Sequence, residues 1–569
     1  MKIKHLFGLA VIAAMSASCS SNEDLGTAGP STGTNESGVG YASFSINLPT
    51  TRGTRAAGDP IFKNGDANEY KVNDATLLIF KKGATEAEGD YTFVESAELG
   101  SMAPWQKPNP DETGVTTHAK ITAKLEKVNK ADNLFALVLL NNGKGANAKV
   151  YLPSEGDKFS AWNTAAKATD NFATTKNGFY MANAPLFNNK NVTTLVPIES
   201  TKIYPTEEEA AKNPAIDIYV ERGLAKVTLT GTAEEKQVAG VTYKGDKVTI
   251  KNWALDVTNK NTFPIHNVDG LTTDYEAIWS NTATPTGSNG ATTQRFVDND
   301  LKTKAKRVYW GKDPNYSNTD ADKTALKTEF NYVENNDVTV EPSKPLYCLE
   351  NTFNLANMMQ GQTTRVVFKA TYKPASLPVG ETTFYKIGKN TDIWSEADLE
   401  QEIKAAVASV VSGAAGKTTV TLNADKNNIT AAGTHYITKD NITVTGVETI
   451  SDENIKAINT QLGLKETDKV GISTYAGGES YYIARIKHFG DDLTQWKSGA
   501  YGENNLEYLG RYGVLRNNWY ELKVNSVSGP GYPSVPEVKP NTPDDEDDNY
   551  INVSVKILDW AKRSQSVDL

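Results

Sequence analysis

Few residues of this 569-residue chain are of the types that catalyse reactions or bind metals at a fixed site. The chain has two cysteines, Cys19 and Cys348, which form no CxxC motif. Its five histidines include no pair with HxxxH spacing. Zinc sites and disulfide frameworks need clustered ligands or paired thiols. We therefore expect no metal, no cofactor and no internal disulfide.

Motifs for phosphate binding and for nucleophilic catalysis are incomplete. Residues 416–418, Gly-Lys-Thr, match the end of the phosphate-binding pattern GxxxxGK(S/T). Val411 stands at the first position of that pattern, which requires glycine. No GxSxG turn is present. The adjacent acids Asp491 and Asp492 are candidates for the carboxylate pair of a glycosidase, but adjacent carboxylates are common in loops. The sequence therefore predicts no catalytic residues and no enzyme.

Cys19 has a clear chemical context. A basic start at 1–5, an apolar run at 6–15 and small residues at 16–18 are typical of a secretory signal. The apolar run is shorter than the about 20 residues that span a bilayer. The small residues before Cys19 resemble a relaxed bacterial lipobox. That resemblance implies a signal peptide at 1–18 and a lipid on Cys19, followed by a flexible tether at 20–40.

Two arginines mark a candidate site of proteolysis. Arg52 and Arg55 lie in a loop of small residues, and Ala56 follows the second arginine. Loops of this composition are preferred sites of proteolytic cleavage. An arginine-specific protease is expected to cut between Arg55 and Ala56, with Arg52 as a competing position.

Strands of one pattern precede this loop and end the chain. Their apolar residues, spaced by two, are Ala42, Phe44, Ile46 and Leu48 in the first strand and Ile551, Val553, Val555 and Ile557 in the last, which runs on to Trp560. Either strand could fill the same groove in a sheet that lacks one strand. Cleavage would free the first strand, and the last strand of another molecule would enter by β-strand addition. The alternative is that the last strand folds back on its own chain.

The segment before the last strand is rich in proline and acidic residues. We expect residues 528–549 to be extended and solvated, and able to reach on the order of 70 Å. Such a reach would suffice to cross to a neighbouring molecule.

The remaining elements are predicted to be mostly strands. Runs of strand length lie at 76–80, 134–140, 216–220, 225–230, 247–250, 364–372, 418–422, 481–486 and 520–527. A helix is predicted from an N-cap at Ser395 to a stop at Gly413, with a weaker one at 451–464. Long polar insertions such as 279–325 are expected to be loops. The fold class is therefore mainly all-β.

The charge balance excludes one class of partner. The chain has 59 basic and 69 acidic residues, for a net charge of −10. Nucleic-acid binding depends on Lys and Arg that neutralise phosphates, so no nucleic-acid partner is expected. Beyond the signal, no apolar run is long enough to cross a bilayer, so membrane attachment would depend on the lipid.

The order of these features resembles a known family. The shared features are the lipobox at Cys19, the first strand followed by Arg55-Ala56, segments 220–227 and 516–520, and the ending at 553–560. Together they resemble the type V pilins, or fimbrillins, of Bacteroidota, especially the shaft subunit of the minor (short) fimbrium of the Porphyromonas type.

The resemblance implies a fold and a role. The implied segments are a removed propeptide at 19–55, transthyretin-like β-sandwich domains at 56–215 and 216–527, a linker at 528–549 and a donor strand at 550–569. The implied role is that of a structural shaft subunit of a cell-surface fimbria, supporting adhesion and biofilm formation. The precursor would be an outer-membrane lipoprotein that is cleaved after Arg55 and polymerises by donor-strand exchange. Its partners would be identical subunits, accessory tip and anchor pilins, the maturation protease and, through its lipid, the outer membrane.

Two other classes of function stay open. A surface glycan-binding lipoprotein of the outer membrane would use some of the 25 tyrosines and 9 tryptophans as sugar platforms. It would need neither the arginine loop nor a terminal strand on a linker. A secreted glycosidase would need an acid/base pair, which the sequence does not identify.

Overall fold

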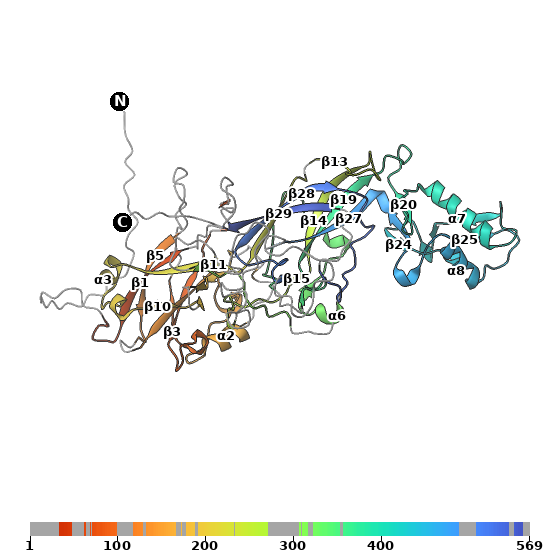
Figure 1. The fold of residues 1–569 in the computed structure, drawn as a ribbon. Coiled ribbons are helices and arrows are strands. Elements are labelled where there is room, and N and C mark those ends of the chain that lie inside the picture. Colours follow the sequence, from red (N-terminus) through yellow and green to blue (C-terminus); the bar gives the residue numbers. More distant parts are fainter. Residues whose placement is uncertain are drawn as a thin grey trace, which may run out of the picture.

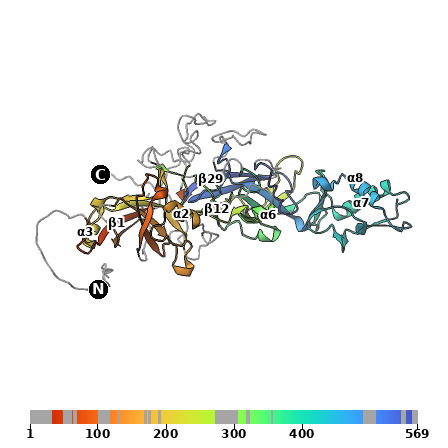
Figure 2. The same ribbon diagram turned by 90° about the horizontal axis from the view of Figure 1, so that it is seen from below.

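The computed structural model describes residues 33–47, 62–63, 69, 71–99, 118–128, 132–166, 172, 178–187, 192–232, 234–270, 306–308, 310–316, 323–352, 357–488, 508–544 and 551–560. Within these ranges the protein is mainly β-strand, as predicted. The molecule is elongated, with an N-terminal sheet at one end, further sheets in the middle and a lobe with two helices at the other end (Figures 1 and 2). No helix in the described ranges is both long and apolar enough to cross a membrane.

The N-terminal sheet has eight strands in the order β4-β3-β6-β7-β11-β1-β5, with β10 also paired to β6. The strands are β1 (Gly40–Asn47), β3 (Ala75–Lys81), β4 (Thr92–Glu98), β5 (His118–Leu125), β6 (Leu134–Leu140), β7 (Met181–Asn183), β10 (Val196–Ile198) and β11 (Ile216–Arg222). The two strands at the ends of this order, β4 and β5, contact each other. The sheet therefore curls around its own core.

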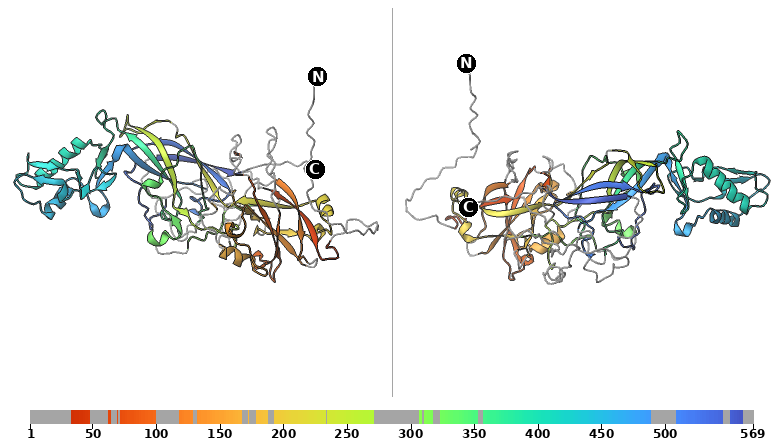
Figure 3. Two further views of the ribbon diagram at one scale, coloured as in Figure 1. Left: turned by 180° about the vertical axis from the view of Figure 1, so that it is seen from behind. Right: turned by 45° about the horizontal axis from the view of Figure 1, so that its top comes forward.

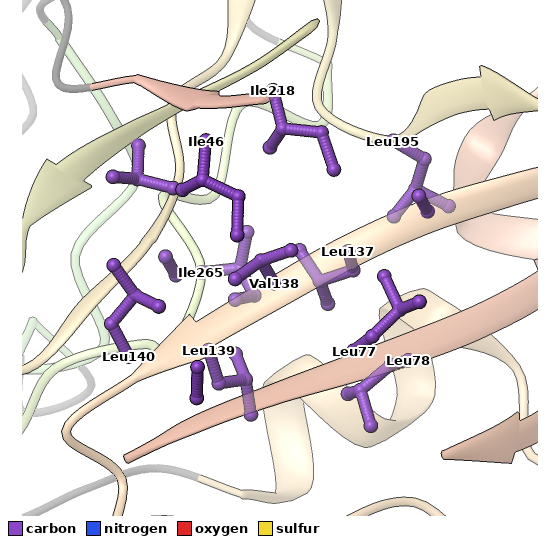
Figure 4. Close-up of a cluster of buried hydrophobic side chains, with 14 of the residues drawn as sticks. Ile46, Leu77, Leu78, Leu137, Val138, Leu139, Leu140, Leu195, Ile218 and Ile265 are labelled. Carbon is purple, nitrogen blue, oxygen red and sulfur yellow. The ribbon is translucent and has the colours of Figure 1, made fainter. Parts of the chain in front are cut away.

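Continuous apolar runs build that core. In β3 every residue but Lys81 is buried, and in β6 every residue but Phe135. Such runs suit strands that are covered on both faces. Figure 4 shows Ile46 of β1 and Ile218 of β11 beside Leu77, Val138 and other side chains of this cluster.

The middle of the molecule is made of two further sheets. One has the order β18-β12-β28-β29-β2 and the other β13-β14-β19-β27. The first contains β18 (Leu346–Cys348), β12 (Ala225–Thr230), β28 (Asn518–Val527), β29 (Ile551–Trp560) and β2 (Phe62–Lys63); the second contains β13 (Lys236–Gln237), β14 (Lys247–Asp256), β19 (Arg365–Lys373) and β27 (Glu479–Arg485). Buried residues of both sheets, including Val227, Tyr520, Trp253 and Phe368, share one hydrophobic cluster.

A third cluster, from Tyr385 to Ile472, lies inside the segment that the sequence predicts as a single C-terminal sandwich. This lobe contains α7 (Glu396–Val410), α8 (Asp452–Gln461), β20 (Phe384–Ile387), β21 (Thr418–Val420), β22 (Asn423–Ala424), β23 (Asn427–Asn428), β24 (Gly433–His435), β25 (Ile442–Val444) and β26 (Ile472–Tyr475). The predicted helix start is confirmed, because the Ser395 hydroxyl accepts a hydrogen bond from the Asp398 amide.

Short elements complete the fold. They are α2 (Phe159–Ala165), α3 (Glu207–Lys212), α6 (Lys323–Leu326), β8 (Leu186–Phe187), β9 (Val192–Thr193), β15 (Thr258–Asn259), β16 (Lys306–Arg307) and β17 (Phe330–Asn331). β16 pairs with β8, and β8 with β9, so the segment after 305 returns to the N-terminal part of the chain.

The expectation that residues 528–549 are solvated is wrong for residues 529–544, which we call the strap. Val538 is 4 % exposed and packs with Val257 and Phe330. Tyr532 and Val535 pack against a cluster that includes Tyr481. Proline favours extended backbone, and apolar residues at 532, 535 and 538 give this extended segment a face that packs on the middle sheets.

Hydrogen bonds hold the strap at both ends. The Tyr532 and Tyr481 amides each donate to the other's carbonyl oxygen at 2.8 Å. At the far end Asp544 is fully buried and its carboxylate accepts from the Thr363 hydroxyl at 2.9 Å. The linker that sequence analysis expects is therefore anchored as far as Asp544, and residues 545–550 lie outside the described ranges.

The docked strap predicts slow amide exchange. The amides of Tyr532 and Asp544 donate to the carbonyl oxygens of Tyr481 and Met358. Their hydrogen–deuterium exchange should therefore be on the order of 100-fold slower than in an unstructured peptide. Mass spectrometry of strap peptides would measure it, with the exposed loop around Val379 as a fast reference. Exchange of the strap as fast as that of the loop would contradict the docking.

Candidate functional site

The first strand of the described chain occupies a slot between two other strands of the N-terminal sheet. β1 pairs antiparallel with β5 along its whole length, from Gly40 opposite Leu125 to Asn47 opposite His118. On its other side β1 runs parallel to β11, with Phe44 opposite Ile216. We call this position the β1 slot. It is an interior position of the sheet, and no chain segment could leave it without exposing two strand edges.

The inner face of β1 is part of the N-terminal core. Ala42, Phe44 and Ile46 are each fully buried in the cluster that also contains Ile218. Burial of the larger two side chains contributes roughly 1.5–3 kcal/mol each. The predicted period of two is thus confirmed for these three residues, while Leu48 lies outside the described ranges.

The outer face of β1 is covered at one position by α3. Ser43 is 3 % exposed, and its hydroxyl donates to the Ala210 carbonyl oxygen of α3 at 2.7 Å. The Thr122 hydroxyl of β5 lies 2.8 Å from the Ser43 oxygen and, because Ser43 donates to Ala210, acts as the donor. A small hydroxyl side chain therefore fits under the helix. The sequence carries no signal of this contact, since Ser43 has the same pattern as any polar residue of an amphipathic strand.

Contacts that do not involve β1 hold α3 in place. The Lys120 ammonium group of β5 donates to the carbonyl oxygens of Ala211 and Asn213 at 2.8 and 3.0 Å. The Thr206 hydroxyl caps the helix by accepting from the Glu209 amide at 3.3 Å. The cover over the slot is thus tied to β5 and to its own cap.

The last strand lies in the middle sheet of its own chain, which is the alternative that the sequence left open. β29 pairs antiparallel with β28, from Asn518 opposite Asp559 to Val527 opposite Ile551 (Figures 1 and 3). On its other edge, among the residues that the structure describes, Asp559 and Trp560 pair with the two residues of β2. β29 is therefore close to an edge strand, with one long ladder and one short one.

The remaining predicted site residues lie outside the described ranges. These are Cys19, Arg52, Arg55 and Ala56. Two described segments border that part of the chain: β1 ends at Asn47, and β2 begins at Phe62. The arginine loop thus connects the interior strand of one sheet to the short partner of β29 in another.

Segments 220–227 and 516–520, singled out in the sequence, meet at the joint between the N-terminal and middle sheets. The Asn517 side-chain oxygen accepts from the Arg222 amide at 3.1 Å, and the Asn517 amide donates to the Leu224 carbonyl oxygen at 2.7 Å. Lys226 pairs with Trp519 across β12 and β28, and its ammonium lies 4.0 Å from the centre of the indole ring. These contacts hold the start of β12, in the middle sheet, next to the end of β11, in the N-terminal sheet.

A cleft of about 1100 Å³ lies beside the N-terminal sheet. Glu88 lines it and accepts hydrogen bonds from the amides of Thr194 and Leu195 at 2.7 and 3.0 Å. Burial raises the pKa of the Glu88 carboxyl to about 8, although these two bonds oppose the shift. Both oxygens of Glu88 are thus used to hold the chain before β10, which is a structural task.

Cys348 and His266 are both buried among other side chains. Cys348 is buried, and burial raises the pKa of its thiol to about 12, so the thiol is unreactive at neutral pH. His266 is buried, with Nδ1 2.9 Å from Glu221 Oε1. Within the described ranges no three residues of the types His, Cys, Asp and Glu are grouped so that they could hold a metal ion.

Comparison with known proteins gives one family match. Residues 473–566, which run from β26 through β29, match the family described as major fimbrial subunit protein type IV, fimbrillin, C-terminal. No curated protein sequence matches the chain.

Two solved structures from Parabacteroides distasonis are similar at low identity. One is a candidate cell adhesion protein, with 10 % identity, a TM-score of 0.39 and coverage of 92 % of this chain and 98 % of the other. The second is a fimbrial assembly protein, with 13 % identity, a TM-score of 0.23 and coverage of 48 % of this chain and 78 % of the other.

The packing of β1 predicts a large effect of truncating its central side chain. Phe44→Ala should lower the free energy of unfolding of the uncleaved N-terminal domain by about 3–5 kcal/mol, because Phe44 is fully buried. Urea unfolding followed by tryptophan fluorescence, to which Trp162 of the same cluster contributes, would measure it. The control Ser45→Ala removes a part-buried side chain of the same strand and should change stability by less than about 0.5 kcal/mol. Equal effects of the two variants would contradict the packing.

Proposed function

We propose that this chain is a structural shaft subunit of a cell-surface fimbria, and the match of residues 473–566 to the fimbrillin C-terminal family supports this proposal. In this proposal the precursor is an outer-membrane lipoprotein through Cys19. An arginine-specific protease cuts after Arg55 and releases the segment that contains β1. The β29 strand of another subunit then fills the β1 slot, which joins subunits head to tail into a filament.

The observation that carries the proposal is the interior position of β1. β1 directly precedes the predicted cleavage loop. It also has strand partners on both sides and a fully buried inner face. Its removal would leave Ala123 and Ile218 without the side chains that cover them. Such a groove, lined by two open strand edges, favours occupation by another strand.

The pairing of β29 supports its role as the incoming strand. In its own chain β29 has one long ladder, with β28, and a two-residue contact with β2. In the β1 slot it would gain ladders on both edges. The exchange would thus replace the ladder with β28 and the two-residue contact with β2 by an eight-residue ladder with β5 and a four-residue ladder with β11. It would also bury the alternating apolar face that Ile551, Val553 and Val555 provide.

The anchored strap limits how far β29 can reach toward another subunit. If the strap stays docked, the free chain runs from Asp544 to Ile551, which spans at most about 25 Å. The slot of the next subunit must then lie close to Asp544. A short connection of this kind fixes the relative position of subunits more tightly than a reach of about 70 Å would.

The test is cleavage followed by assembly. Residues 20–569, treated with an arginine-specific protease, should give filaments by negative-stain microscopy and a ladder on gels of unboiled samples. Deletion of 549–569 should abolish both. Arg55→Ala should block the cut at Arg55, and adding Arg52→Ala tests the competing position.

Two results would contradict the proposal. A clean cut at Arg55 that yields only monomers, even at high concentration, would favour a tip subunit or the glycan-binding lipoprotein. Filaments that persist after deletion of 549–569 would show that another segment joins the subunits.

A further inference from the structure

The cover that α3 forms over the β1 slot restricts which residue can stand at the position of Ser43. That side chain is 3 % exposed and lies 2.7 Å from the Ala210 carbonyl oxygen and 2.8 Å from the Thr122 hydroxyl. Ala210 is itself fully buried. Lys120 of β5 holds the end of α3 independently of β1. Tyr204, just before α3, also pairs with Tyr41 of β1, so an incoming strand has to replace that backbone pair as well.

The five residues of β29 that alternate with its apolar face are Asn552, Ser554, Lys556, Leu558 and Trp560. A strand in the slot must turn its apolar face to the core, so one of these five has to stand under α3. Lys556 would bury an ammonium group, and Asn552, Leu558 and Trp560 are larger than serine. Only Ser554 has both the size of Ser43 and a hydroxyl that can donate to the Ala210 carbonyl oxygen.

We propose that Ser554 of the incoming strand takes the position of Ser43 under α3 and thereby fixes the register of strand exchange. This inference rests on the proposed function. The register places Val553 and Val555 at the positions of Ala42 and Phe44, whichever way the strand runs, because β29 reads Ile-Asn-Val-Ser-Val-Lys-Ile around Ser554.

The slot has to adapt at more than one position, because valines replace the fully buried Ala42 and Phe44. The tightest contact is at Gly40. The register puts an isoleucine, Ile551 or Ile557, at the position of Gly40, where an added Cβ would lie 2.6 Å from Ile203 Cγ2. Ile203 must therefore change its side-chain conformation. Thr34, which also borders Gly40 at 3.5 Å, would leave with the cleaved segment and provide space.

Disulfide trapping tests the register. Thr122 is directly opposite Ser43 in the β1–β5 pair, so Thr122→Cys combined with Ser554→Cys should link subunits covalently after cleavage and oxidation. The matched pairs Thr122→Cys with Asn552→Cys or Lys556→Cys should give at least tenfold less crosslink, measured as ladders on boiled, non-reducing gels. Ser43→Cys with Thr122→Cys in the uncleaved protein should form the equivalent disulfide and serves as the positive control. The native Cys348 is buried and does not compete.

Substitutions of β29 give an independent readout. Ser554→Leu should reduce the amount of polymer at least tenfold, because the larger side chain cannot fit under α3. The control Lys556→Leu changes the same face of β29 two residues away and should still polymerise.

The outcomes separate the register from the proposed function. If wild-type protein forms filaments and the crosslink appears at 552 or 556 instead of 554, the register is wrong and strand exchange stands. Equal polymerisation of Ser554→Leu and wild type would also overturn the register. If cleaved wild-type protein forms no filaments, the proposed function fails and the register fails with it.

Discussion

The N-terminal sheet depends on having a strand between β5 and β11. β1 fills that position with hydrogen bonds on both edges and with Ala42, Phe44 and Ile46 in the core. A free edge on each side and an open core would be costly in water, because unpaired backbone groups and apolar side chains would both be exposed. The requirement is for a strand of a certain pattern, however, and not for this segment in particular. That distinction makes an exchange of strands physically reasonable.

The other features of the molecule relate to this one position. The α3 helix covers its outer face and restricts one residue to the size of serine. The β29 strand has the right alternation and, within the described part of its own chain, a long ladder on one edge and a two-residue contact on the other. The strap between β28 and β29 is docked as far as Asp544, so any movement of β29 would begin close to that residue. The N-terminal and middle sheets meet at a joint formed by Arg222, Lys226, Asn517 and Trp519. In the proposed filament this joint would hold the β1 slot and the β29 strand of one subunit at a fixed distance and angle.

Much of the fold can be predicted from the sequence where local patterns are strong. The apolar runs of β3 and β6, the alternation of β1 and the N-cap of α7 each leave a periodic or capping signal that tertiary structure does not override. The docking of the strap is not predictable from sequence, because its prolines and acids are typical of a solvated linker, while Tyr532, Val535 and Val538 are too few to give a periodic signal. The lobe of α7 and α8 has its own core. No change in the sequence pattern marks where this insertion begins and ends within the predicted C-terminal domain.

The candidate site was predictable in outline only. Period-two alternation identifies the two strands, but it cannot identify which outward residue is covered, because α3 lies more than 160 residues from Ser43 in sequence. The role of Ser554 depends on that long-range contact.

The most direct test of the account is a cryo-electron microscopy map of filaments assembled from the cleaved chain. The account predicts a strand between β5 and β11 that continues through residues 545–550 into the docked strap of the neighbouring subunit. A slot that still holds β1, or a strand that connects back to its own subunit, would contradict it.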